Sequence, residues 1–358
     1  MRASKLALAT LLAMGCLNAV HAADAPKIAL RASDVWDDDY PTVRALKNAG
    51  ELMSQRTNGR ITLKVFSNGS LGSEKETLEQ VKTGSLDVVR VNISPMNNIC
   101  PETAVPALPF LFRSVDHLHT VLDSKIGEEI LKTCEPMGYV GMGYYDSGAR
   151  SIYAKKPVRS IADTKGMKIR VQQSDLWLAV ASAMGANPTP MPLGEVYTAL
   201  KTGLTDAAEN NIPSYENGKH YEAVNVYSMT EHSMAPEVIM FSKKKWDSIS
   251  AADQKIIKQA FRDSIPLNRK MWAERENKSM QVLLAAGITV VKDVDKKSFQ
   301  DAMGPVYAKF ASTDNMKKLV KDIQDTPDTV SIAAAAKKAA APVAKPAAKP
   351  AAKADAKK

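Results

Sequence analysis

The chain has 358 residues and a formal net charge of +9. That charge lies mainly at the two ends. Arg2 and Lys5 contribute two positive charges near the N-terminus, and residues 333–358 contain seven lysines and one aspartate. The rest of the chain therefore has a net charge of +1. The basic balance therefore does not indicate a nucleic-acid-binding fold, and we expect no nucleic acid among the partners. The 310 residues between the two ends, 23–332, exceed what one hydrophobic core usually holds, so we expect two lobes.

The N-terminal residues have the pattern of an export signal. A basic n-region precedes an apolar run over residues 6–17, and Val20 and Ala22 are small residues at the positions before a cleavage site. We expect a signal peptide over residues 1–22, cleavage after Ala22 and a mature protein in the periplasm; an uncleaved membrane anchor is the alternative. No later stretch approaches the ~20 apolar residues that a spanning helix requires.

The first part of the folded chain alternates strands and helices. Apolar residues follow strand, helix, strand, helix and strand spacing in turn, which predicts an α/β fold with a largely parallel sheet. Ser73 and Glu76 have the spacing of a capping box at the start of the second helix. Ligands of such sheets bind beyond the carboxyl ends of the strands, where residues 34–40, residues 70–74 and Asn92 are expected.

The later chain continues the pattern in a second lobe. Residues 102–113 are too rich in proline for a regular element, and we place the passage between lobes near residues 146–150. We expect residues 24–148 with about 236–275 in the first lobe, and residues 149–235 with about 276–325 in the second. Strands are expected at residues 27–32, 61–66, 86–91, 139–145, 169–171, 224–229, 237–241 and 288–291, and helices at residues 42–56, 73–83, 114–133, 176–184, 194–201, 251–284 and 296–311.

The C-terminal residues 333–358 consist almost entirely of Ala, Lys and Pro. Such a segment has little apolar surface to bury and cannot offset the entropy of ordering, so we expect a disordered tail. A contact with anionic lipid or cell wall is the alternative function of its lysines.

Two cysteines remain after removal of a signal peptide containing Cys16. Cys100 and Cys134 would then lie in a compartment that permits disulfides. A bridge between them and two separately buried thiols are both compatible with the sequence, which does not give their geometry.

Motifs of catalysis are missing from the sequence. It contains neither a Gly-rich phosphate loop nor a Gly-x-Ser-x-Gly or His-Glu-x-x-His motif. His117 and His119 stand two apart on an expected helix and therefore point to different faces. We expect no metal, no cofactor and no enzymatic activity.

Two arginines are candidates for binding an anion. Arg170 ends a short apolar strand and faces a proline-rich loop, and Arg150 follows a turn. A guanidinium matches a carboxylate with two hydrogen bonds, each worth about 1.5–3 kcal/mol before the desolvation of both ions is counted. The alternative for either residue is a structural arginine paired with a carboxylate of its own lobe.

Other polar and aromatic residues could read a hydroxylated molecule. Glu209 and Asn210 follow a helix and could bind hydroxyls, although such residues often cap helices or turns. Tyr40 and Trp177 could stack on a sugar ring, with a place in the core as the alternative.

Several motifs in the second half of the folded chain occur in a recognisable order. They are Gly-x-Lys-x-Arg-Val at residues 166–171, Gly-Ala-x-Pro-Thr-Pro-Met at residues 185–191, Glu-Val-Tyr-x-Ala-Leu at residues 195–200 and Asp-x-x-Glu-Asn at residues 206–210. Together with Gly148-x-Arg150, this combination resembles the extracytoplasmic solute-binding proteins of TRAP transporters, the family typified by the C4-dicarboxylate-binding protein. The resemblance covers residues 26–320.

The resemblance implies a periplasmic binding protein with two α/β lobes, a ligand cleft between them and a long helix crossing both, for which the run from residue 251 is suitable. It implies a small-molecule carboxylate ligand and TRAP membrane permease subunits as partners, and we expect a monomer. The family's carboxylate-gripping arginine corresponds to Arg170, a second ligand-facing arginine to Arg150 and an amide beside the ligand to Asn210.

Two departures argue against sialic acid as the ligand. Asn92 stands where some sialic-acid-binding members have a carboxylate, and Leu193 stands at their aromatic position beside the hinge. The segments at residues 171–177, 209–211 and 230–237 instead resemble members that bind hexuronates such as glucuronate and galacturonate.

A hexuronate needs one cation and several mixed donors and acceptors, whereas Glu74 would repel the second carboxylate of a dicarboxylate. A dicarboxylate, keto acid or aromatic acid remains the alternative ligand. The full set of expected ligand-binding residues is Arg170, Arg150, Asn210, Glu74, Asn92, Gln172, Tyr40 and Trp177.

Overall fold

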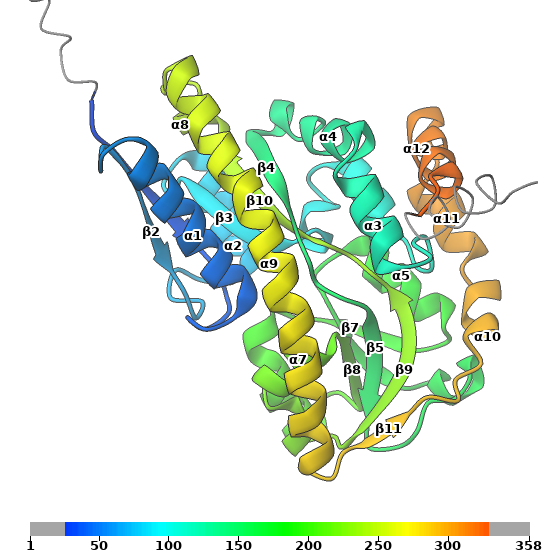
Figure 1. The fold of residues 1–358 in the computed structure, drawn as a ribbon. Helices are drawn as coiled ribbons and strands as arrows, with labels where there is room; N and C mark the ends of the chain where they lie inside the picture. The colour runs from blue at the N-terminus through cyan, green and yellow to red at the C-terminus, as the bar shows by residue number, and fades with distance from the viewer. Residues whose placement is uncertain (1–25, 329–358) are drawn as a thin grey trace, which may run out of the picture.

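The protein is built on two β-sheets, seen in a computed structural model that describes residues 26–328 (Figure 1). The expected signal peptide, its cleavage site and the C-terminal tail lie outside the described residues. Within residues 26–328, no helix is both long and apolar enough to cross a membrane.

The first sheet has five strands in the order β2-β1-β3-β10-β4. Its β2, β1 and β3 are parallel, as the sequence predicts, and β10 returns antiparallel to both of its neighbours. The β10 strand is buried along its whole length, as expected for a strand with neighbours on both sides. The strands are β1 (Ile28–Ser33), β2 (Ile61–Phe66), β3 (Val88–Asn92), β4 (Tyr139–Tyr145) and β10 (Glu237–Ser242).

The second sheet has six strands in the order β11-β9-β5-β8-β6-β7. Here β6 is parallel to both β7 and β8, whereas β5 is antiparallel to β8 and β9. The strands are β5 (Arg150–Ala154), β6 (Lys168–Val171), β7 (Asn187–Pro190), β8 (Ala207–Asn210), β9 (Val226–Ser233) and β11 (Thr289–Val291).

Three segments connect the two sheets. The chain passes from the first sheet to the second between β4 and β5, and it returns between β9 and β10. The third connection is α9 (Ala251–Ala285), which packs on α1 and β4 beside the first sheet and on α7 beside the second (Figure 1). The expected long helix that crosses both lobes is thus present.

The remaining helices pack on the sheets or on one another. Ser73 and Glu76 form the expected capping box at the start of α2, and Gly84 ends that helix in the left-handed conformation. The helices are α1 (Pro41–Arg56), α2 (Glu74–Thr83), α3 (Val115–Leu122), α4 (Lys125–Lys132), α5 (Asp175–Ala183), α6 (Val196–Thr202), α7 (Ile212–Asn217), α8 (Lys243–Trp246), α10 (Lys296–Asp301), α11 (Gly304–Phe310) and α12 (Asp314–Asp325), with a 3₁₀ segment at Pro101–Ala107.

The helix expected over residues 114–133 is in fact two helices. Ser124 separates them, because its hydroxyl accepts the backbone N–H of Ile126 at 3.1 Å and so begins α4. At Gly127 a Cβ would lie 2.2 Å from the carbonyl oxygen of Leu122, so the tight turn between α3 and α4 requires glycine there.

The α12 helix is attached to elements of the first lobe. It packs on α4 and on the segment Pro101–Ala107. The ring Nε2 of His117 lies 2.8 Å from the Ile323 carbonyl, and Arg113 donates to the carbonyl of Gln324 at 2.9 Å. From the sequence we expect no helix after residue 311 and place residues 276–325 in the second lobe, because position along the chain does not reveal the contacts with α4.

Cys100 and Cys134 form a disulfide, with their Cα atoms 5.3 Å apart. Of the two alternatives left open by the sequence, the bridge is therefore the one present. It joins the segment before the 3₁₀ helix at Pro101–Ala107 to the end of α4.

Candidate functional site

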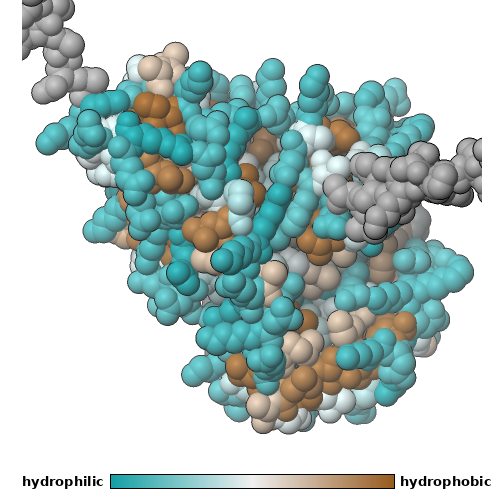
Figure 2. Space-filling view, viewed as in Figure 1, coloured by the Kyte–Doolittle hydropathy of each residue, from teal (hydrophilic) through white to brown (hydrophobic). Residues whose placement is uncertain are grey.

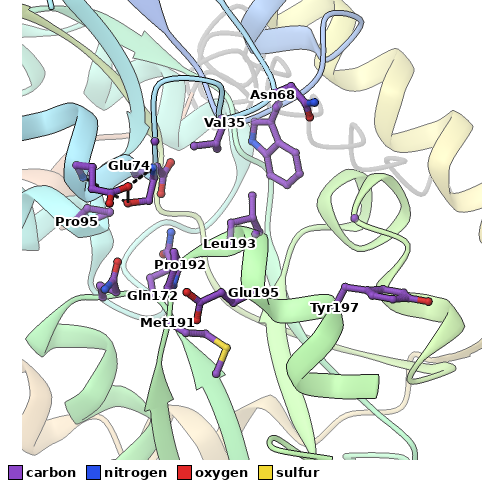
Figure 3. Close-up of a pocket in the computed structure, with 18 of the residues that line it drawn as sticks. Val35, Asn68, Glu74, Pro95, Gln172, Met191, Pro192, Leu193, Glu195 and Tyr197 are labelled. Atoms are coloured by element: carbon purple, nitrogen blue, oxygen red, sulfur yellow. Dashed lines mark hydrogen bonds between the residues drawn. The ribbon is translucent and has the colours of Figure 1, made fainter. Parts of the chain in front are cut away.

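Two adjoining cavities lie between the sheets. The outer one has a volume of about 610 Å³ and opens to solvent, and the inner one has about 20 Å³, enough for a single water molecule. Figure 3 shows that the outer cavity lies between Glu74 and Pro95 on one side and Gln172, Met191 and Leu193 on the other. The two cavities share five lining residues, namely Trp36, Glu74, Arg170, Gln172 and Leu193.

The register of the second sheet brings its polar residues to one edge. The parallel strands β6 and β8 end near each other, with Arg170 opposite Ala208 and Asn210 two residues beyond. Arg150 begins β5, which runs antiparallel to β8 with Ser151 opposite Asn210. The amino end of β5 therefore meets the carboxyl ends of β6 and β8 at the cavity, as expected for an α/β sheet.

Arg170 is buried, yet its charge is not neutralised by a carboxylate. Its Nε and Nη2 donate to the carbonyl of Met191 at 3.1 and 2.6 Å, and it makes no ion pair within residues 26–328. Burial lowers the pKa of Arg170, while Glu209 opposes this from a distance. Because Arg170 lines both cavities, an anion there would find a desolvated guanidinium with unused donors.

Arg150 has a carboxylate partner already. It donates from Nε and Nη2 to the carboxylate of Glu209 at 2.6 and 2.8 Å, and from Nη1 to the Asn210 Oδ1 at 3.0 Å. Burial is the largest influence on Glu209 and opposes its ionisation, but the charge and hydrogen bonds of Arg150 and the hydrogen bond with His232 together outweigh burial and lower the pKa of Glu209 to about 2. Arg150 lines the inner cavity as half of an ion pair, so it is a weaker anion site than Arg170.

Three carboxylates surround one arginine on the wall formed by the first lobe. Arg90 donates to Asp34 at 2.8 Å, to Glu237 at 2.8 Å and to Glu74 at 3.3 Å. Burial raises the pKa of Glu74 to about 7; Arg90 opposes this shift, and Glu237 adds to it. The cluster carries more negative than positive charge, and Glu74 is its member that lines both cavities.

Two amide side chains offer unused hydrogen-bonding capacity to the inner cavity. The Oε1 of Gln172 is buried and has no partner within residues 26–328. Asn210 accepts at Oδ1 from Arg150 and from the Asn211 backbone, while its Nδ2 makes no hydrogen bond to the described residues. Because buried polar groups normally have partners, these atoms are candidates for contact with a ligand.

Asn92 also lines the inner cavity, but its side chain is fully used. Its Nδ2 donates to the Ala235 carbonyl at 3.1 Å and to Glu237 at 3.2 Å, and its Oδ1 accepts from Ser94. Asn92 therefore holds the wall of the cavity and has little capacity left for a ligand.

Tyr40 and Trp177 lie behind the lining of these two cavities. The Tyr40 ring stacks on Trp36 at 4.4 Å between centroids, and its hydroxyl lies 3.1 Å from that of Ser214 across the two lobes. Trp177 packs under Arg150 and donates to the Ser94 hydroxyl at 2.7 Å. Tyr40 and Trp177 thus support the lining residues Trp36 and Arg150 from behind.

Trp36 is one of several lining residues that are absent from the set expected from the sequence. Its only signal in the sequence is an aromatic residue within a polar loop that follows a strand. Leu193 was recognised only as a departure from sialic-acid binders, and it also lines both cavities. Within the described residues, no cluster of three or more His, Cys, Asp or Glu side chains could hold a metal ion.

Comparison with known proteins identifies close relatives of the chain. A family model described as bacterial extracellular solute-binding protein, family 7, matches residues 32–314. The chain is similar to the crystal structure of a TRAP periplasmic solute binding protein from Bradyrhizobium sp. BTAi1 in complex with α/β-D-galacturonate. The two sequences are 56% identical, and the structures match with a TM-score of 0.82 over 83% of this chain and 100% of that chain.

Two further relatives show the same likeness. A TRAP periplasmic solute binding protein from Xanthobacter autotrophicus with bound β-D-galacturonate is 47% identical, with a TM-score of 0.82 over 83% of this chain and 100% of that one. A solute-binding protein of Chromohalobacter salexigens is 38% identical over 297 residues, which are 82% of this chain and 88% of the relative.

Proposed function

This chain belongs to bacterial extracellular solute-binding protein family 7, and we propose that it captures a hexuronate, D-glucuronate or D-galacturonate, in the periplasm and delivers it to a TRAP-type secondary transporter. The family membership confirms the resemblance drawn from the motifs around Arg170. The protein is accordingly a binding protein and not an enzyme. Its export by a signal peptide and its action as a monomer are parts of the proposal.

The observation that carries the proposal is the state of Arg170. A buried cation without a carboxylate partner is costly, and it persists where an anion supplies the missing charge. Since Arg170 opens on both cavities and its Nη1 makes no hydrogen bond to the described residues, a ligand carboxylate is the anion that fits.

The other free groups match the hydroxyls of a sugar acid. Gln172 Oε1 can accept from a hydroxyl, Asn210 Nδ2 can donate to one, and a hydroxyl of the ligand can donate to Glu74. A site that offers both donors and acceptors suits a polyhydroxylated molecule better than a simple acid. Relatives with bound galacturonate support this assignment.

A dicarboxylate, keto acid or aromatic acid bound by the same class of protein is the alternative. The wall opposite Arg170 disfavours a dicarboxylate, because Asp34, Glu74 and Glu237 share only one arginine. A second negative group on the ligand would face this cluster and be repelled.

Contact with the inner cavity requires movement in the cleft. The outer cavity of about 610 Å³ can hold a six-carbon acid, but the inner cavity of about 20 Å³ is too small, so such an acid reaches Asn210 only when side chains or lobes shift. Hydrogen bonds that cross between lobes would re-form on closure, including Tyr40 to Ser214 at 3.1 Å and Asn217 to Asp37 at 2.5 Å. We therefore propose that the lobes open for loading and close on the ligand.

Calorimetric titration of the purified protein with glucuronate, galacturonate, succinate, pyruvate and benzoate tests the ligand class. We expect saturable binding of one or both hexuronates, and affinities at least tenfold weaker for the other three acids. Tight binding of succinate with no heat from either hexuronate would replace the proposed ligand by the alternative. Mass spectrometry of ligand released from denatured protein gives an independent identification.

A further inference from the structure

Trp36 occupies a fixed place at the edge of both cavities. It follows β1, it is 8% exposed, and its backbone N–H donates to the Asp34 carboxylate at 2.9 Å. Its carbonyl accepts from the backbone of Asn68 at 2.6 Å. The backbone on both sides of Trp36 is therefore held, which fixes the position from which the indole projects.

One face of the indole is covered by another aromatic ring. Tyr40 stacks on it with 4.4 Å between centroids and 13° between planes, and Trp272 meets Tyr40 edge-on at 5.8 Å. The Tyr40 hydroxyl is in turn 3.1 Å from Ser214. This stack fixes the plane of the indole before any ligand is bound, which lowers the entropic cost of using it as a contact surface.

The inner cavity has an uneven distribution of polarity. Of its eleven lining residues, nine are polar or charged, and Trp36 and Leu193 are the two that are apolar. Leu193 comes from the second lobe and packs against the aromatic cluster that contains Trp36. The apolar surface of the cavity is thus confined to one pair of side chains contributed by opposite lobes.

A pyranose ring has matching polarity. Its hydroxyls and carboxylate project from the edge of the ring, while axial C–H groups make part of each face apolar, a surface that an aromatic ring covers well. An open-chain sugar acid has no such rigid face, and it must also lose the freedom of several C–C bonds to fit the site.

We propose that Trp36 is a specificity-determining residue that stacks on the ring face of a cyclic hexuronate and thereby selects it over an open-chain sugar acid of the same charge. This inference rests on the proposed function, because it concerns the ligand held by Arg170. Tyr40 supports the indole from behind, and Leu193 closes against the cluster from the other lobe.

Titrations with a matched pair of ligands test this role. Galacturonate is cyclic and galactonate is its open-chain counterpart, with six carbons and one carboxylate in each. We expect Trp36→Leu, which keeps apolar volume but removes the flat ring, to weaken galacturonate binding at least tenfold and galactonate binding less than threefold. Trp36→Phe should retain galacturonate affinity within about threefold. Trp246→Ala, which removes an indole that packs on Phe241 in the first lobe, should change neither affinity.

Equal losses for both ligands in Trp36→Leu, or no loss for either, would overturn the stacking role while leaving the proposed function intact. Wild-type protein that binds no hexuronate would instead overturn the proposed function. A measurement on wild-type protein applies even if the variant does not fold: saturation-transfer NMR with irradiation of aromatic protons should show the strongest transfer to C–H protons on one face of the galacturonate ring. Equal transfer to both faces would contradict the proposal.

Discussion

At the scale of single residues, three buried arginines have different charge partners. Arg90 faces three carboxylates and Arg150 is paired with Glu209, whereas Arg170 makes no ion pair within the described residues. Sequence reasoning left a ligand-binding and a structural role open for both Arg150 and Arg170, because the type of residue does not reveal its partners. The hydrogen bonds favour Arg170 as the ligand-binding arginine, since Arg150 has a lobe-internal carboxylate and Arg170 uses only a backbone carbonyl.

Tyr40 and Trp36 show a limit of sequence reasoning at the same scale. Both stand in the polar loop after β1, and either could contact a sugar ring. The structure puts Trp36 on the cavity and Tyr40 behind it, in a stack whose order depends on tertiary packing with Trp272. Neither residue type nor spacing distinguishes the front ring from the rear one.

Glu74 should make ligand affinity depend on pH. Its pKa is raised to about 7, chiefly by burial and against the effect of Arg90, so Glu74 loses its proton as pH rises from 6 to 8. The negative charge then repels an anionic ligand, and we expect galacturonate affinity to fall about three- to tenfold over that range. Calorimetry at both pH values measures the change.

Glu74→Gln should flatten this pH dependence, and Glu79→Gln, an exposed change on the same helix, should preserve it. The raised pKa of Glu74 also makes the stability of the fold depend on pH. The folded protein holds the Glu74 proton more firmly than the unfolded chain, so the contribution of Glu74 to the free energy of unfolding falls as pH rises from about 4.5 to about 7. If galacturonate affinity had the same pH dependence in wild-type protein and in Glu74→Gln, Glu74 would not be the group that causes it.

At the scale of elements, the long and strongly patterned segments are predictable from sequence. The strand Ile61–Phe66, the strand Tyr139–Tyr145 and the start of α9 at Ala251 lie where the apolar spacing places them. The strands β7 and β8 were not predicted, because each has four residues and mixed polarity, and the parallel pairing with β6 stabilises them. These short strands position Arg170 and Asn210.

The disulfide between Cys100 and Cys134 should stabilise the first lobe. It closes a loop with a sequence separation of 34, for which restriction of the unfolded chain predicts about 4 kcal/mol. We expect the Cys100→Ala, Cys134→Ala double variant to lose about 2–4 kcal/mol of unfolding free energy in urea while galacturonate affinity changes less than threefold. A loss below about 0.5 kcal/mol would show that the bridge adds little to the folded state.

At the scale of the whole molecule, the binding site is shared between two sheets. Arg170, Gln172 and Asn210 come from the second sheet and its loops, whereas Trp36 and Glu74 follow or flank strands of the first. Chain length predicts two lobes, and the family resemblance predicts the crossing helix, but neither predicts the contacts of α12 with α4.

The face in Figure 2 is mainly hydrophilic, with an apolar area at its lower end, where α9 ends in Figure 1 and Val282 and Leu284 are exposed.

Closure of the lobes should depend on the contact between Tyr40 and Ser214. The two hydroxyls join Tyr40, the residue before α1, to α7 across the cleft at 3.1 Å. One such hydrogen bond is worth about 0.5–1.5 kcal/mol, so Tyr40→Phe should weaken galacturonate binding about two- to tenfold, mainly through faster dissociation. Stopped-flow fluorescence measures the rate.

Tyr144→Phe is the matched control for this change, because its hydroxyl donates to the Gly127 carbonyl within the first lobe. That variant should lose stability and keep the dissociation rate of the wild-type protein. If Tyr40→Phe released ligand no faster than Tyr144→Phe, the contact between Tyr40 and Ser214 would have no part in holding the closed state.

The most direct test is calorimetric titration of galacturonate into Arg170→Met, with Arg159→Met as the control for loss of an exposed arginine. Methionine preserves the length and apolar character of the stem but removes the guanidinium. The proposed function predicts at least a hundredfold loss of affinity in Arg170→Met, equal to about 2.7 kcal/mol, and no change in Arg159→Met. Arg170→Met protein that binds galacturonate within threefold of wild-type affinity would contradict the assignment of Arg170 as the carboxylate-binding residue.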